Sequence, residues 1–505
     1  MYDLVIRGGL VYDGQGNLPQ KNDIAVKNGV IVRVGTVPEK GIRELDATGL
    51  AVTPGFIDSH SHADRGALLG HPLDEMVEQG ITTAITGQCG GSIYPVPAKG
   101  REQSAEDFFA RLGEIKTAMN FALLIGNGTL RNTVMGKEMR EPAAEELAAM
   151  KKLLGDALDA GALGLSLGLI YVPGSYAKTD ELCELASVLS THDGVMAAHI
   201  RNESDHVEEA VDEYLDIAKG ANVTSVISHF KVCRVQNHGK VVKTIAQVEK
   251  AVAEGYPIYM DVYPYTATST SLAATFVTQE LLPRPNEEIV EELKKPEVRA
   301  AQKAALIPVK GADLSFVYIT SAKDCPQYVG KRLSEIAAEK GVDMYEACYD
   351  VLCESNLSAG ACYFTVSEDD MRRVLAHPRA MVGTDGGTTQ GRMMYHPRSR
   401  GTFPRAIGKY AREEGVVPMT EMIRKMTSLP AKVYGLAKKG RIAEGCDADI
   451  CVFDADTVRD RATFTEPFHS PAGMRYVIVN GEIAVENGKQ TAARSGRFIP
   501  RSSKA

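Results

Sequence analysis

The feature that most constrains the fold is a series of short apolar runs, each followed by a polar or glycine-rich stretch and then by a helical pattern. Eight such runs occur, at 55–58, 82–86, 122–126, 163–167, 195–198, 225–228, 257–262 and 380–383. Helical patterns lie between them, for example at 143–160 and 207–218. Buried parallel strands that alternate with helices form a βα architecture, and eight repeats predict a closed (β/α)8, TIM-like barrel.

Both ends of the chain carry a different pattern. Apolar and polar residues alternate there around Asn28-Gly29 and again around Asn480-Gly481, a strong hairpin signal. We therefore expect one small β-sandwich domain built from 1–51 and 440–490, with the barrel at 52–439 and a tail at 491–505. The last two apolar runs lie more than 100 residues apart, which predicts an insertion at about 280–350.

Charge and cysteine content narrow the class of protein. The 505 residues include 57 Lys and Arg against 65 Asp and Glu, a net charge of -8 without basic blocks. Nucleic acid and anionic membranes are therefore not expected partners. The first residues do not resemble a signal peptide, and no apolar run reaches the roughly 18 residues that span a bilayer. Nine scattered cysteines without a C-x-x-C pair predict a cytoplasmic protein, and the oligomeric state stays unknown.

Chemistry-bearing residues follow five of the eight runs. In a barrel of this kind the active site lies at the C-terminal ends of the strands. The residues found there are His60 and His62 after the first run, Cys89 after the second, His199 after the fifth, His229 and Lys231 after the sixth, and Asp385 after the eighth. Imidazole, thiolate and carboxylate are ligands of zinc and related ions. The set predicts a metal site at this rim.

Each residue also has a simpler interpretation. His199 or His229, taken alone, could be a hydrogen-bonded histidine of the barrel. His60 and His62 would point the same way on an extended segment, but H-x-H pairs also occur by chance. Cys89 could fill a small apolar space, although the glycines around it leave the backbone open to a ligand. Asp385 could cap the turn Asp-Gly-Gly. Lys231 could form an internal salt bridge with Glu203 or Asp261 instead of binding an anionic substrate.

Several motifs resemble a known family. The segments at 54–62 (PGFIDSHSH) and 440–453 (GRIAEGCDADICVF) resemble signatures of the amidohydrolase superfamily. Narrower motifs resemble the N-acyl-D-amino-acid deacylases, or D-aminoacylases, along essentially the whole chain. They lie at 86–90 (TGQCG), 171–174 (YVPG), 199–203 (HIRNE), 228–231 (SHFK), 261–265 (DVYPY) and 396–405 (HPRSRGTFPR).

This resemblance implies roles for individual residues. Cys89, His199 and His229 would hold one zinc ion tightly, with Cys89 in place of the carboxylated lysine of many relatives, and His60, His62 and Asp385 would form a second, weaker or partly empty site. Lys231 and Tyr171 would hold the substrate carboxylate, Tyr263 would lie beside the reacting carbonyl, and Arg284 is the nearest candidate for an assisting arginine. One departure is Ala63, where relatives often carry an acidic residue.

The resemblance also implies the reaction. We expect metal-dependent hydrolysis of N-acyl-D-amino acids, small-molecule substrates, to a carboxylate and a free D-amino acid. Asp385 would act as general acid and base. Two alternatives remain open, a cyclic amide hydrolase of the hydantoinase or dihydroorotase kind and, less expected, a non-catalytic barrel scaffold. Arg392, His396, Arg398, Arg400 and Arg405 follow the eighth run and form either a cationic rim for anionic substrates or a solvated face.

Overall fold

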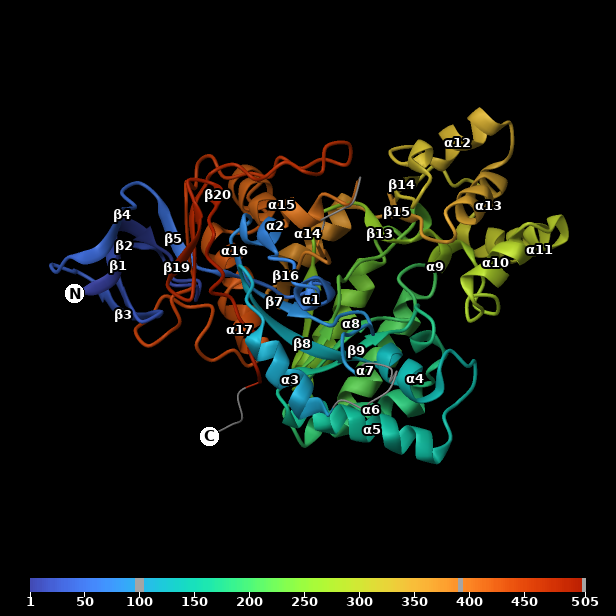
Figure 1. Cartoon of the computed structure of the whole chain (residues 1–505), viewed down its shortest axis with the longest axis horizontal. Coiled ribbons are helices and arrows are strands. Elements are labelled where there is room, and N and C mark those ends of the chain that lie inside the picture. The colour runs from blue at the N-terminus through green and yellow to red at the C-terminus, as the bar shows by residue number, and fades with distance from the viewer. Residues whose placement is uncertain (96–103, 389–393, 502–505) are drawn as a thin grey trace.

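The computed structural model describes residues 1–95, 104–388 and 394–501. Figure 1 shows three parts side by side: a β domain that contains the N-terminus, a central barrel, and a group of helices at the opposite end. The barrel lies between the other two parts, so its rim borders the helical group.

The barrel is an eight-stranded parallel sheet. Its strands, in spatial order, are β6 (Phe56–Asp58), β7 (Ile81–Thr86), β8 (Asn120–Gly126), β9 (Gly164–Gly168), β10 (Val195–His199), β11 (Ser225–Ile227), β12 (Ile258–Val262) and β16 (Ala380–Val382). The first and last strands approach each other, since Ser59 N donates to Val382 O (3.4 Å) and Asp385 N to His60 O (2.8 Å). Each predicted run coincides with one strand, so the (β/α)8 prediction is confirmed.

These strands form because both of their faces are covered. Every residue of β7, β8, β9 and β10 is buried, as expected for a parallel sheet enclosed by helices. Alternate side chains such as Ile85, Leu124 and Val226 fill the barrel interior. The side chains on the other face pack against the surrounding helices. The interior is thus a solid core, and chemistry is confined to the rim.

The helices surround the barrel and connect its strands. They are α1 (Asp64–Leu68), α2 (Asp74–Val77), α3 (Ala105–Glu114), α4 (Asn127–Met135), α5 (Ala144–Asp159), α6 (Thr179–Ser190), α7 (Val207–Ala221), α8 (Val241–Ala253), α14 (Glu368–Ala376), α15 (Arg398–Arg405), α16 (Met419–Met426) and α17 (Ser428–Val433). Short turns of 3-10 helix occur at Gly174–Tyr176, Val235–Asn237 and Pro326–Tyr328, and a π-helix at Ala406–Glu413. The helical patterns expected at 143–160 and 207–218 correspond to α5 and α7.

The β domain combines strands from both ends of the chain in one mixed nine-stranded sheet. Its strands are β1 (Tyr2–Val11), β2 (Gln20–Lys27), β3 (Val30–Gly35), β4 (Gly41–Asp46), β5 (Ala51–Pro54), β17 (Ile450–Phe453), β18 (Met474–Val479), β19 (Glu482–Glu486) and β20 (Lys489–Gln490). Both expected hairpins form, and Asn28 and Asn480 adopt the left-handed conformation that such turns need. The two ends join where β5 pairs antiparallel with β17.

A long excursion between β12 and β16 forms the helical group. It contains β13 (Thr268–Ser271), α9 (Leu272–Phe276), α10 (Asn286–Leu293), α11 (Pro296–Lys310), β14 (Val317–Ser321), α12 (Leu333–Lys340), α13 (Met344–Glu354) and β15 (Gly360–Tyr363). The three strands pair in the order β13-β15-β14 as an antiparallel sheet. These elements have their own apolar core and extend on both sides of the range 280–350.

The C-terminal segment lies along the N-terminal ends of β8 and β9, at the end of the barrel opposite the ligands. Phe498 is buried against Phe109 and Phe121, with ring centroids 5.4 Å and 5.6 Å away. Ile499 N donates to Phe121 O, and Gly496 pairs with Thr117. Most of the expected tail is therefore packed structure, and 502–505 lie outside the described residues.

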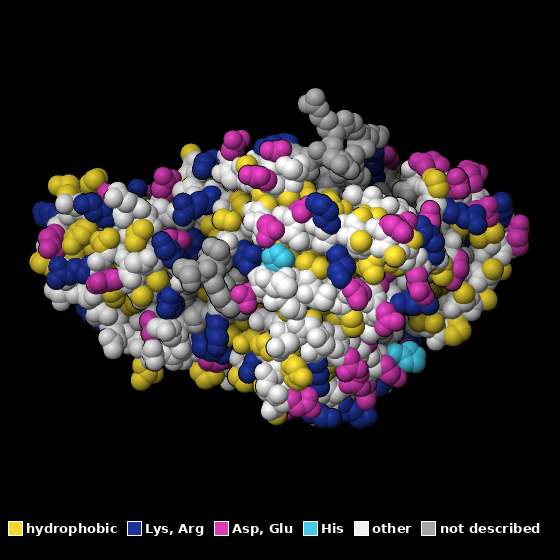
Figure 2. Space-filling model, turned by 90° about the horizontal axis from the view of Figure 1, so that it is seen from below, with side chains coloured by type: hydrophobic (Ala, Val, Ile, Leu, Met, Phe, Trp, Pro, Cys, Tyr) yellow, Lys and Arg dark blue, Asp and Glu magenta, His cyan; other side chains and the backbone are white. Residues whose placement is uncertain are grey.

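The surface carries charges of both signs. On the face shown in Figure 2, Lys and Arg side chains are interspersed with Asp and Glu side chains. None of the described helices has the length and apolar character needed to pass through a membrane.

Candidate active site

The predicted ligand residues meet at the C-terminal rim of the barrel. His60 and His62 follow β6, Cys89 follows β7, His199 ends β10, His229 follows β11 and Asp385 follows β16. Their ligand atoms form two groups, each with all atoms within 4.8 Å of one another: His60, His62, Cys89 and Asp385 in one, and Cys89, His199 and His229 in the other. Cys89 belongs to both groups and connects them.

Backbone conformation helps to direct three of these side chains. Cys89, His229 and Asp385 have φ values of 53°, 37° and 47°, in the left-handed region that non-glycine residues rarely adopt. Such a conformation costs on the order of 1–3 kcal/mol and tends to occur at functional sites. At the Cys89 turn, Gly90 approaches the backbone of Gly168 so closely that a Cβ atom would lie 2.6 Å from Gly168 N. The glycine is needed for this approach.

In the first group of ligands His199 and His229 are buried and Cys89 is partly buried. The Sγ atom of Cys89 lies 3.4 Å from His229 Nε2, and the rings of His199 and His229 are 4.4 Å apart between centroids. Both ring nitrogens of His199 are buried, and neither makes a hydrogen bond to the described residues, although Nε2 lies 3.5 Å from Glu203 Oε2. Buried polar atoms are normally paired, so this imidazole is suited to a ligand that the protein itself does not supply.

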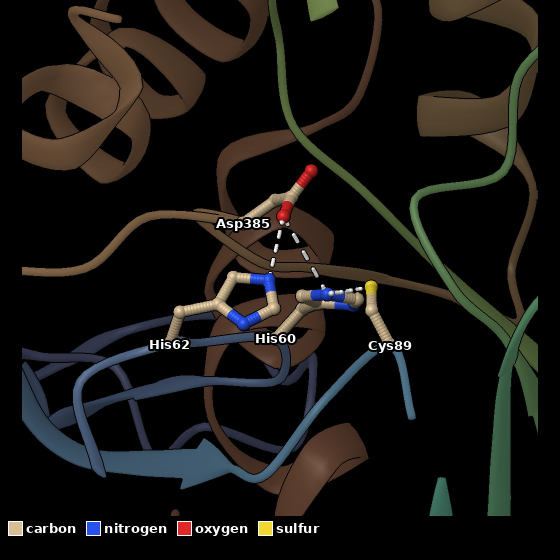
Figure 3. Close-up of side chains that lie close together, drawn as sticks. All are labelled: His60, His62, Cys89 and Asp385. Atoms are coloured by element: carbon tan, nitrogen blue, oxygen red, sulfur yellow. Dashed lines mark hydrogen bonds and ion pairs between the residues drawn. The ribbon is translucent and has the colours of Figure 1, made fainter. Parts of the chain in front are cut away.

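The second group surrounds Asp385 (Figure 3). His62 Nε2 lies 3.1 Å from Asp385 Oδ1, and His60 Nε2 lies 3.6 Å from the same oxygen. Cys89 Sγ is 3.4 Å from His60 Nε2. His60 is fully buried, whereas the side chain of His62 is 40% exposed. The second group is therefore more open to solvent than the first.

Electrostatics favour the metal-binding protonation state of three of these side chains, Cys89, His199 and Asp385. Burial opposes protonation of His60, His62 and His229, but the anionic groups around them outweigh it and raise the pKa of these three imidazoles. Burial raises the pKa of the Cys89 thiol, but His60 and His229 outweigh it and hold the pKa well below its ordinary value. Burial lowers the pKa of His199, which favours the neutral imidazole. Burial opposes ionisation of Asp385, yet Arg398 and the imidazoles keep its pKa well below normal. Thiolate, neutral imidazole and carboxylate in this arrangement fit a zinc centre.

Carboxylates behind the ligands orient the imidazole rings. Asp261 is buried, accepts from His229 N (2.7 Å) and lies 3.4 Å from His60 Nδ1 through its other oxygen. Glu203 Oε1 lies 3.0 Å from His229 Nδ1. Such outer partners fix the orientation of ligand histidines. The sequence indicates these two acids only as possible partners for Lys231, because spacing along the chain does not show which imidazole ring a carboxylate faces.

A cavity of about 390 Å³ opens onto the ligands. His199, His229 and Asp385 line it together with Lys231, Tyr171 and Tyr263, so six of the expected residues share one space. Lys231 Nζ lies 2.6 Å from Glu203 Oε1 and 2.8 Å from His229 Nδ1. The Tyr171 hydroxyl contacts Thr270 Oγ1 (3.2 Å). The Tyr263 hydroxyl is buried and has no hydrogen-bond partner among the described residues.

Arg284 is not brought to this site. It lies between α9 and α10 in the excursion, its side chain is 50% exposed, and its guanidinium is 4.0 Å from Glu292. The arginine beside the ligands is Arg398, at the start of α15, whose guanidinium lies 2.8 Å from Asp385 Oδ2 and 4.7 Å from the centre of the Tyr263 ring. The sequence alone assigns Arg398 only to the loop after the eighth apolar run, because its contact with Asp385 depends on tertiary packing.

Other basic residues of the rim loop are neutralised by protein groups. Arg400 pairs with Glu78 (3.1 Å) and Arg405 with Asp460 (3.0 Å). His396 Nε2 contacts Ala267 O at 2.9 Å, and Arg392 lies outside the described residues. A free cationic rim is therefore not formed by Arg400 and Arg405.

Comparison with known proteins shows the family to which the chain belongs. The model of the amidohydrolase family matches residues 43–305 and 326–485. The chain is 36% identical to N-acyl-D-glutamate deacylase and 35% identical to D-aminoacylase, both from Alcaligenes xylosoxydans xylosoxydans. Each alignment covers 99% of this chain, and 96% and 98% of the relative, respectively.

A solved structure is also similar over its full length. It is N-acyl-D-glutamate deacylase from Bordetella bronchiseptica, complexed with zinc and a phosphonate inhibitor that mimics the tetrahedral intermediate. The TM-score is 0.85 at 34% identity, with 99% of this chain and 100% of that chain covered. The chain therefore belongs to the D-aminoacylase, or N-acyl-D-amino-acid deacylase, family of the amidohydrolase superfamily.

Proposed function

We propose that this protein is a zinc-dependent deacylase that hydrolyses the amide bond of N-acyl-D-amino acids to a carboxylate and a free D-amino acid. The observation that carries the proposal is the pair of ligand groups that share Cys89, one of which includes the carboxylate of Asp385, open to a cavity large enough for a small molecule. Membership of the family supports the reaction class, and the chemistry of the rim supports a metal.

The two groups would hold the metal differently. Cys89, His199 and His229 would bind one ion tightly, because the two histidines are buried, Cys89 is partly buried, and His199 has no competing hydrogen bond. His60, His62 and Asp385 would bind a second ion more weakly, because His62 is exposed and Asp385 is already paired with Arg398. Zinc bound in such a site lowers the pKa of a metal-bound water to about 7 and polarises a carbonyl group.

The residues of the chain would complete the reaction. Asp385 Oδ1 faces His62 and would accept the proton of the attacking water, then deliver it to the departing amine nitrogen. The Tyr263 hydroxyl lines the cavity without a hydrogen bond to the described residues and would donate one to the carbonyl oxygen as negative charge develops there.

A cationic amine and a phenol at the cavity wall would hold the substrate carboxylate. Lys231 and Tyr171 are the residues proposed for this role, and both line the cavity next to His229 and His199. Lys231 already contacts Glu203, so binding would require the amine to share or exchange that partner. The preference for the D configuration rests on the relatives.

The test is hydrolysis of paired N-acetyl-D- and N-acetyl-L-amino acids by purified protein of measured zinc content, with hydantoin and dihydroorotate assayed in parallel. We expect turnover of D substrates and none of the cyclic amides. Turnover of cyclic amides alone would replace the proposal with the cyclic amide hydrolase. Zinc-free protein that stays inactive after zinc addition would favour the scaffold.

A further inference from the structure

The substrate cavity extends beyond the ligands toward the excursion between β12 and β16. Its wall includes Thr275, Gln279 and Lys310 from that excursion, together with Cys233 and Arg234 from the loop after β11. This end of the cavity is formed by residues that the proposed chemistry does not use. It is therefore free to recognise a part of the substrate other than the reacting amide.

Four cationic side chains line the described part of the cavity, and three of them are paired. Arg201 is bound to Glu213 (2.8 Å), Lys231 to Glu203 (2.6 Å) and Arg234 to Asp205 (2.8 Å). Lys310 differs from them. Among the residues that the structure describes, no carboxylate lies within 4.0 Å of its amine, and no hydrogen bond satisfies it.

Lys310 is held in position despite this lack of a partner. It is the last residue of α11, and the residues on either side are fixed: the Arg234 guanidinium donates to Val309 O, and the Tyr345 hydroxyl donates to Gly311 O (2.7 Å). Burial, and then the positive charge of Arg234, lower the pKa of the Lys310 amine. The amine is therefore placed where its charge is unfavourable until an anion arrives.

We propose that Lys310 binds a carboxylate at the end of the substrate side chain, so that the enzyme acts on N-acyl-D-amino acids with acidic side chains. This inference rests on the proposed deacylase function and names its substrate class. An amine that is partly buried without a partner gains a charge-assisted hydrogen bond from such a carboxylate. A neutral side chain would leave the amine without an anionic partner.

Glutamate is expected to be a better substrate than aspartate. Lys310 comes from the excursion rather than from the ends of the barrel strands that carry the ligands. The longer side chain of glutamate reaches further from the reacting amide than that of aspartate. Glutamine has nearly the same shape as glutamate without the charge, so the pair isolates the electrostatic contribution.

The experiment compares wild type, Lys310→Met, Lys310→Arg and Lys303→Met on N-acetyl-D-glutamate, N-acetyl-D-glutamine and N-acetyl-D-methionine, and on N-succinyl-D-methionine, which carries its extra carboxylate on the acyl group. Lys303 lies on the same helix, where its amine pairs with Asp343 (2.7 Å) outside the cavity, so it is a matched control. We expect Lys310→Met to lower kcat/KM for the glutamate substrate by about tenfold to a hundredfold, mainly through KM. Activity on the neutral substrates should change little, Lys310→Arg should keep the acidic preference, and Lys303→Met should match wild type.

The outcomes separate this inference from the proposed function. Equal kcat/KM for glutamate and glutamine substrates in wild type, with no selective loss in Lys310→Met, would overturn the role of Lys310 while leaving the deacylase activity established. Absence of hydrolysis of every N-acyl-D-amino acid by the zinc-loaded wild type would overturn both. A dependence on Lys310 only for N-succinyl-D-methionine would place the recognised carboxylate on the acyl group and refute the side-chain assignment.

Discussion

Lys231 Nζ lies 2.6 Å from Glu203 Oε1, within a cavity wall where both side chains are nearly buried. Burial disfavours the charged amine, but Glu203 more than offsets it and raises the pKa of Lys231 above its ordinary value. The internal salt bridge weighed in the sequence analysis is therefore formed with Glu203, and Lys231 can bind substrate only as part of this pair.

Replacing Lys231 tests that dual role. Lys231→Met should raise KM for N-acyl-D-amino acids several-fold, because the substrate carboxylate loses a cation, and should leave Glu203 buried without its charge partner. Breaking one side of a buried pair costs about 3–5 kcal/mol, so the melting temperature should also fall. The checks are steady-state kinetics and thermal unfolding. An unchanged KM with lower stability would assign Lys231 a structural role alone.

Removing the shared thiolate should affect both ligand groups. Cys89→Ala should lower the bound zinc and reduce kcat by several orders of magnitude, since Cys89 is the single residue common to the two groups. Metal analysis by mass spectrometry checks the first effect, and hydrolysis the second. Cys183→Ala, on α6 away from the cavity, is the control and should keep metal and rate. Full zinc content in Cys89→Ala would refute the ligand role.

The packing of the C-terminal segment predicts a stability effect without a catalytic one. Phe498→Ala removes a buried ring that contacts Phe109 and Phe121 at the end of the barrel opposite the ligands. We expect a loss of about 3–5 kcal/mol in the free energy of unfolding. Urea denaturation measures the loss, and kcat at 25 °C should stay close to wild type. A small change in stability would mean that the ring is not packed as described.

Lys425 predicts a pH dependence of stability. Its side chain is fully buried and donates to His377 O and Ala380 O (3.2 Å), and burial lowers its pKa to about 8. The unfolded chain keeps the ordinary pKa of about 10.4, so between these values it binds more protons than the folded chain. Stability should therefore rise with pH over this window, by at most about 1.4 kcal/mol per unit.

The measurement is chemical denaturation at several pH values in that window. Lys425→Met should lose the part of the slope that this group contributes, while other titrating groups act equally in both proteins. Identical slopes for the two proteins would show that Lys425 keeps its ordinary pKa in the folded state.

The strands and metal ligands could be predicted because each leaves a local pattern. Buried parallel strands are continuous apolar runs, and residues after β6, β7, β10, β11 and β16 must meet at one rim once the sheet closes. The turns at Asn28-Gly29 and Asn480-Gly481 can likewise be predicted from their local sequence. Their conformational requirements are encoded within a few residues.

Other features depend on contacts distant in sequence. The excursion begins with β13, whose sequence TSTS contains no apolar residue to mark a strand. Distance along the chain indicates Arg284 as the assisting arginine, whereas Arg398 contacts Asp385 because the packing of α15 brings its first residue to the barrel rim. Cys89 gives no sign in sequence of its left-handed backbone, since cysteine is not a residue type that favours it. Lys310 ends a helix with an ordinary pattern, so its place in the cavity wall cannot be predicted from the sequence.

The pairing of β5 with β17 has a consequence for biosynthesis. Val52 pairs with Val452, so the whole barrel lies between these two strands in the chain. At about 5–20 residues per second, the N-terminal strands leave the ribosome tens of seconds before the strand that completes their sheet. During that interval the edge of β5 is exposed, and the nascent chain depends on barrel folding or on chaperones to keep this edge from pairing with other chains.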